Sequence, residues 1–223
     1  MMKIIFCLGL ITVFISCKKQ EAAYIQPLQD SVSYNVIFTT KWSEPAFSVP
    51  VNAHLTKLIG MVHTTDTFLW SNKPASPGLE FVAEIGSNRK MMDEIDSMIV
   101  KQKVVSQFAI DPPVINSSIE FPMKFTSKFN AISFASMIAP SPDWFTGLNN
   151  YSLIQNDKWI DDITIDLFIY DAGSEDGDVF GYDNPSTVPL QNVSFLTAPN
   201  ATVLANGNPA IGKIATIRFI RNQ

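Results

Sequence analysis

The densest group of side chains able to do chemistry lies in the segment DAGSEDGD, residues 171–178. It holds the four carboxylates Asp171, Glu175, Asp176 and Asp178, with Gly173 and Gly177 between them. Glycine permits left-handed backbone, so several oxygens of a short loop can turn toward one point. Ca²⁺ binds about six to eight oxygen ligands from such loops. The segment therefore predicts a cation site; an acidic, solvated turn is the alternative.

A second carboxylate stands in an unusual setting, PSPDWF at residues 140–145. Proline fixes φ, and the rings of Trp144 and Phe145 are expected to bury one side of this loop. Asp143 is then expected to point toward the place where Asp171 emerges. The alternative is that Asp143 caps a turn, or the N-terminus of a helix formed by DWFTGL.

Other chemistries can be assembled from the same residues with less support. His54 and His63 could bind a transition metal, but two isolated histidines are more often structural. Ser133, His63 and Asp171 could form a triad, yet no nucleophile elbow accompanies them. Asp143 and Asp171 could act as the carboxylate pair of a glycosidase. A cluster this acidic calls for a bound ion instead, so we predict that the protein is not an enzyme.

The chain begins MMKIIFCLGLITVFISCKK, with a basic start, a short apolar run and a cysteine. This pattern predicts a signal peptide over residues 1–16, with VFISC as a bacterial lipobox. We expect lipidation at Cys17, a lipidated tether over residues 17–31, and one domain over residues 32–223. Lys18, in place of an aspartate after the cysteine, favours the outer membrane or the cell surface.

Composition narrows the function further. The formal net charge is -5, and no Lys/Arg run follows Lys18 and Lys19, which argues against a nucleic-acid partner. The only cysteines are Cys7 and Cys17, so the domain has no disulfide. Its stability must come from a large core or a metal.

Periodicity predicts the elements that would position these carboxylates. Five runs rich in branched and aromatic residues read as strands: 32–42, 121–129, 131–139, 162–170 and 213–221. One segment, about 88–101, has apolar residues at three- and four-residue steps and predicts an amphipathic helix. The expected fold is all-β, an antiparallel two-sheet β-sandwich with one short helix.

Several segments carry a resemblance: YNVIFTTKWS (34–43), HLTKLIGMVH (54–63), FLWSNKPASPGLEFVAEIG (68–86), IAPSPDWFTGL (138–148) and DLFIYDAGSEDG (166–177). In this order they resemble the spondin domain of secreted matrix proteins. The resemblance implies a C2-like sandwich with a calcium site at one end, held by Asp143, Asp171 and Glu175. The family's DAGTD reads DAGSE here, with Asp176 next, so either Glu175 or Asp176 could face the ion.

Together these patterns predict a lipid-anchored, calcium-binding module for adhesion or recognition at the bacterial envelope. Its partner would be an extracellular or envelope ligand, either protein or glycan, that no residue identifies. Two alternatives stay open: a structural envelope lipoprotein that calcium merely stabilises, and a metal-dependent polysaccharide hydrolase.

Overall fold

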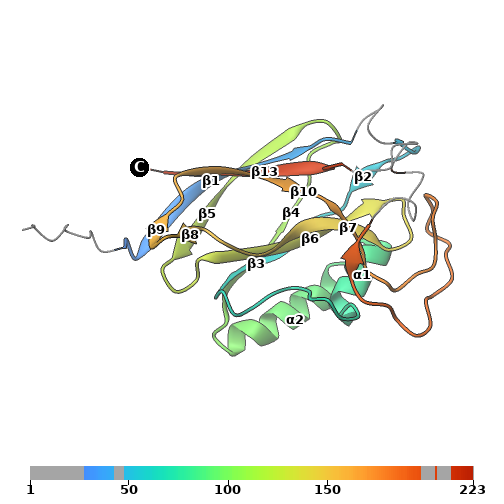
Figure 1. Cartoon of the computed structure of the whole chain (residues 1–223), viewed down its shortest axis with the longest axis horizontal. Helices are drawn as coiled ribbons and strands as arrows, with labels where there is room; N and C mark the ends of the chain where they lie inside the picture. The colour runs from blue at the N-terminus through green and yellow to red at the C-terminus, as the bar shows by residue number, and fades with distance from the viewer. Residues whose placement is uncertain (1–27, 43–47, 197–203, 205–211, 223) are drawn as a thin grey trace, which may run out of the picture.

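The protein is described by a computed structural model in which residues 28–42, 48–196, 204 and 212–222 are placed (Figure 1). Its first six strands are β1 (Ser31–Thr40), β2 (His54–Leu55), β3 (Leu58–His63), β4 (Val104–Ile110), β5 (Ser118–Thr126) and β6 (Ala131–Ala139). The remaining strands are β7 (Trp144–Ser152), β8 (Ile154–Gln155), β9 (Lys158–Trp159), β10 (Asp162–Leu167), β11 (Ile169–Asp171), β12 (Ser194–Phe195) and β13 (Ala215–Arg221). The helices are α1 (Pro77–Ile85) and α2 (Arg89–Val100).

Apart from β8 and β9, which pair only with each other, the described strands form two facing sheets, which confirms the expected all-β sandwich. One sheet has four strands in the order β10-β13-β1-β5. The other has seven strands, in the order β12-β11-β7-β6-β3-β4 with β2 paired to β6. The paired strands within both sheets run antiparallel. In Figure 1 the helices cover the outer face of the seven-stranded sheet.

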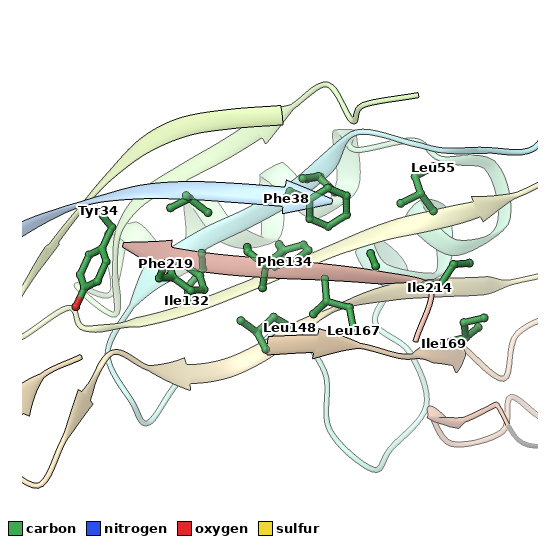
Figure 2. Close-up of a cluster of buried hydrophobic side chains, with 14 of the residues drawn as sticks. Tyr34, Phe38, Leu55, Ile132, Phe134, Leu148, Leu167, Ile169, Ile214 and Phe219 are labelled. Carbon is green, nitrogen blue, oxygen red and sulfur yellow. The ribbon is translucent and has the colours of Figure 1, made fainter. Parts of the chain in front are cut away.

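The core between the sheets follows from the alternation of apolar residues. Along β1, every second residue from Val32 to Thr40 is buried, while the residues between them are partly exposed. Tyr34 and Phe38 thereby meet Phe134 and Phe219 in the large apolar cluster drawn in Figure 2. Because side chains alternate across a strand, this register places one complete face of β1 in the core.

The helix layer explains why β6 is buried along its whole length. The inner face of β6 packs in the core, and its outer face lies under the helices. Met91 and Ile95 of α2 are buried there in a second apolar cluster with Ile59 and Met61 of β3. The helix predicted at about 88–101 is thus confirmed as α2, and its apolar stripe is core packing.

The sequence prediction missed the helix α1. Its start is marked by Ser76, whose Oγ accepts a hydrogen bond from the Leu79 amide (3.2 Å), with Pro77 following. Glu94 of α2 adds a cap by accepting from the Gly78 amide at 2.7 Å. The helix ends at Gly86, which has the left-handed φ of 65°. Ser76, Pro77 and Gly86 are therefore local signals by which the sequence itself marks this helix.

Strand pairing brings the two acidic segments together. β7 begins immediately after Asp143, β11 ends at Asp171, and the two strands pair with Trp144 opposite Asp171. The helix considered for DWFTGL is wrong, because Trp144–Ser152 is the strand β7.

The contacts of the domain begin before residue 32: the carbonyl of Gln29 accepts from the Trp159 indole at 2.7 Å.

Candidate metal centre

Asp143 is held rigidly at the end of the sandwich. Its side chain is fully buried, as are Trp144 and Phe145 after it. The local turn is closed by Ser141, whose Oγ accepts from the Trp144 amide at 3.2 Å, which leaves the Asp143 carboxylate free for longer-range contacts. The prolines and aromatic rings therefore fix the backbone from which this carboxylate projects.

One oxygen of Asp143 anchors the acidic loop. Oδ2 accepts hydrogen bonds from the amides of Ser174 (2.7 Å) and Glu175 (3.1 Å) and from the Ser174 hydroxyl (3.3 Å). The other oxygen, Oδ1, is buried with no hydrogen-bond partner. Burial raises the pKa of this carboxyl, and the two amides oppose that shift. An unpartnered buried oxygen costs free energy and would be satisfied by a cation.

Asp171 and Asp176 lie on either side of the turn that follows β11. Asp171 Oδ1 accepts from the Gly173 amide at 2.7 Å. Burial, and then the charge of Asp143, raise the pKa of Asp171 to about 6. Asp176 is exposed and accepts from the Thr187 hydroxyl at 2.6 Å. Gly173 has a φ of 72°, and a Cβ there would stand 2.6 Å from the carbonyl oxygen of Gln191, so this turn requires glycine.

Glu175 points into a different environment. Burial is the largest cause that raises the pKa of Glu175, to about 7. The charge of Glu84 in α1 is the next largest cause, and the charge of Asp143 follows. Its Oε2 is buried without a hydrogen-bond partner. Asp176, by contrast, acts on Asp171. The two adjacent acidic residues thus differ in their electrostatic surroundings: the charge of Asp176 acts on Asp171, whereas the charge of Glu84 acts on Glu175.

These carboxylates border an open hollow of about 560 Å³. Its walls include Asp171, Glu175, Asp176 and Asp178, with Thr187 and Gln191 opposite. The segment that carries Thr187 is tied to the acidic loop by backbone hydrogen bonds, such as Thr187 N to Ser174 O at 2.9 Å. The site is therefore formed by backbone segments far apart in the sequence and is open to ligands from solvent.

Comparison with known proteins identifies the family of this domain. The family model Spondin_N matches residues 32–206, most of the chain. The chain belongs to the spondin N-terminal domain family. It is 30% identical to rat Spondin-2 over 201 residues and 32% identical to human Spondin-2 over 203 residues, in each case 84% of this chain and 61% of the relative. It is 30% identical to Spondin-1 of Xenopus laevis over 193 residues, which cover 81% of this chain and 24% of that protein. The match thus spans less than two thirds of each relative.

In this spondin domain, the carboxylates named from the sequence come from the two expected loops, and their donor set suits a hard cation. Oxygen is the donor that Ca²⁺ requires, and two of the buried oxygens have no other partner. As the side chains lie, no three His, Cys, Asp or Glu residues among those described converge to hold an ion. Binding therefore requires side-chain rotation, and the ligand set stays a prediction.

The two histidines have different surroundings. His63 is buried, with Nε2 2.8 Å from Ser133 Oγ and Nδ1 2.8 Å from the Thr64 carbonyl oxygen. The serine and histidine of the triad considered above thus do meet, but a backbone carbonyl, and not Asp171, occupies the position of the triad acid. His54 is exposed at the start of β2, with Nδ1 2.7 Å from the carbonyl oxygen of Asn52.

The predicted signal peptide, Cys17 and residues 17–27 of the tether lie outside the described residues, so they stay sequence-based predictions. Among the residues that are described, no helix has the length and apolar character needed to cross a membrane.

Proposed function

We propose that this protein is a calcium-binding recognition module of spondin type, carried on the bacterial envelope by a lipid anchor at Cys17. The observation that carries the calcium site is Asp143, a fully buried carboxylate with one oxygen anchored to the acidic loop and the other unpartnered. A buried carboxylate is costly unless it is paired, hydrogen-bonded or bound to a metal, or unless a proton neutralises it. The main influences on its pKa are burial and the hydrogen bonds from residues 173–175, and no lysine or arginine of the described residues is among them.

Calcium would offset the mutual repulsion of the Asp143, Asp171 and Glu175 carboxylates. Asp143 already links the β6–β7 loop to the loop after β11, so a cation held by both would cross-link the end of the sandwich. The adjacent hollow gives an extracellular ligand access to this end. Recognition of a ligand there also accords with membership of the spondin family, although the relatives are longer than the matched region.

Calcium binding is tested by thermal unfolding of the purified protein with calcium or with EDTA. If calcium binds only the native state, a concentration ten times Kd should stabilise the protein by about 1.4 kcal/mol. Asp171→Asn should lose this response. Asp166→Asn is the control, because Asp166 is an exposed carboxylate of β10 that pairs with Lys213. An unchanged unfolding temperature at about 5 mM calcium would contradict the proposal, since extracellular modules bind at or below that range.

The anchor is tested separately. Cys17→Ser should move the protein from the membrane fraction to the soluble fraction without changing its calcium response. Retention of the variant in the membrane would exclude lipidation at Cys17 as the anchor.

A further inference from the structure

The two facing sheets end in four strands: β12 and β4 in the seven-stranded sheet, and β10 and β5 in the four-stranded sheet. An end strand turns half of its backbone N–H and C=O groups away from the sheet, where another strand can pair with them. Three of these strands have features that oppose such pairing. β5 contains Pro122, which has no N–H, β10 carries the charged Asp162 and Asp166, and β12 is only two residues long.

β4 has none of these features. Its seven residues, VVSQFAI, include no proline and no charged side chain. Val105 is 48% exposed, and Ala109 is exposed as well. The register with β3 shifts near Val105 but is regular from Ser106 to Ile110. Among the described strands β4 pairs with β3 alone, so it offers an open edge to an added strand.

The sequence of β4 and its two flanking residues is complementary to itself. In an antiparallel pair of two β4 strands with Gln107 opposite its own copy, Val105 of each strand lies opposite Ala109 of the other, so exposed apolar side chains cover each other. Lys103 lies four positions before Gln107, and Asp111 lies four positions after it. Lys103 of each copy therefore lies opposite Asp111 of the other, at both ends of the pair. Opposite charges in this arrangement stabilise paired strands, and like charges destabilise them.

Both charged side chains are available to a second copy. Within the chain, Lys103 pairs with Asp66, and Asp111 pairs with Lys57 at 2.6 Å. The four side chains are between 46% and 81% exposed. Ion pairs this exposed contribute little to stability, so they can rearrange or extend into a network. The long lysine side chain can also span the one-residue offset that the irregularity near Val105 introduces.

We infer that β4 is a self-association surface, through which two copies of this chain pair antiparallel and join their seven-stranded sheets into one continuous sheet. The contact is symmetric, with the same strand on both sides of a two-fold axis through Gln107. This axis is perpendicular to the sheet, so both helix layers lie on the same face of the joined sheet. The inference goes beyond the proposed function and does not depend on bound calcium.

The test is the dissociation constant of the dimer, measured by sedimentation equilibrium of the purified protein in EDTA at low salt. Lys103→Glu places like charges opposite each other at both ends, so it should weaken the dimer by at least about 5-fold, and Asp111→Lys should do the same. The double variant Lys103→Glu/Asp111→Lys restores opposite charges between the copies, so its dissociation constant should return to within about 2-fold of the parent.

The double variant also separates pairing between copies from effects within one chain. It makes both internal contacts, with Asp66 and with Lys57, repulsive, so an effect that acts through the stability of the single chain would be largest there. Recovery of the dimer is expected only if residues 103 and 111 face each other across the two copies. A double variant that dimerises no more tightly than the single variants would overturn the inference.

A second pair of variants tests the strand itself. Ala109→Lys adds a charge to the exposed edge and should weaken the dimer. Val51→Lys is the control, because Val51 is 86% exposed and lies outside β4; its dissociation constant should match the parent. Both should keep the circular dichroism spectrum of the parent. A dimer that Ala109→Lys does not weaken would overturn the inference. A parent that stays monomeric up to about 1 mM, the weak end of specific association, would also overturn it and leave β4 to a strand of another protein.

Discussion

The anchoring role of Asp143 can be measured apart from its role as a ligand by comparing Asp143→Ala with Asp143→Asn in EDTA. In the native protein, Oδ2 accepts from the buried amides of Ser174 and Glu175. Alanine removes the acceptor and leaves both donors unpaired. Asparagine keeps an acceptor oxygen in nearly the same place while it removes the charge. The two variants therefore differ mainly in these hydrogen bonds.

The magnitude follows from those two donors. Each unpaired buried amide costs about 1–3 kcal/mol, so Asp143→Ala should lose about 2–6 kcal/mol before relaxation. Relief of the buried charge, whose pKa is raised by burial, offsets part of this loss. The stability of Asp143→Asn should stay within about 1 kcal/mol of the parent. The amide nitrogen takes the place of the unpartnered Oδ1, and the cost of burying it roughly offsets the gain from removing a repelled charge.

The assay is urea unfolding of the three proteins in EDTA at pH 7.5, followed by the same series in calcium. Without calcium, the order of stability should be parent and Asp143→Asn together, then Asp143→Ala. With calcium, only the parent should gain stability. Equal stability of the two variants in EDTA would refute the anchoring argument, because it would mean that the hydrogen bonds to residues 174 and 175 contribute nothing.

Three further predictions concern the scaffold. Burial lowers the pKa of His63 below 6.5 in the folded protein, so the stability that neutral His63 contributes is complete above pH 6.5 and is lost as the pH falls toward the folded pKa. The urea midpoint of His63→Gln should therefore fall less between pH 6.5 and 5 than that of the parent. Parallel curves for the two proteins would contradict this. Gly147→Ala should lower the free energy of unfolding by on the order of 3 kcal/mol, because its Cβ would stand 2.1 Å from the Phe134 carbonyl oxygen. Gly181→Ala is the control: a Cβ there meets nothing within 4 Å, so stability should change by less than about 0.5 kcal/mol in the same urea assay. Ser76→Ala should cost about 1 kcal/mol through the loss of the α1 cap, measured by thermal unfolding; an unchanged midpoint would mean that Glu94 alone caps the helix.

The sequence by itself determined the elements whose side-chain pattern is local. Alternation along β1 and the three- and four-residue steps in α2 are properties of adjacent residues, so they could be recognised without knowing what each face packs against. The motifs around Asp143 and Asp171 indicated the family, and they predict a cation site at the end of the sandwich. The caps of helix α1, Ser76 and Gly86, are local as well, so they also can be recognised in the sequence.

Only the tertiary structure determined which groups surround each carboxylate. Glu175 and Asp176 are neighbours in the chain, but their surroundings differ: the Asp176 side chain accepts a hydrogen bond from Thr187, and the pKa of Glu175 is raised by burial and then by the charge of Glu84. Glu84 lies 91 positions before Glu175 in the sequence, so no spacing rule could show that its charge acts on Glu175. Such pairings depend on how the helix layer and the loops pack on the sheet, because chain segments far apart meet only when the whole fold has formed.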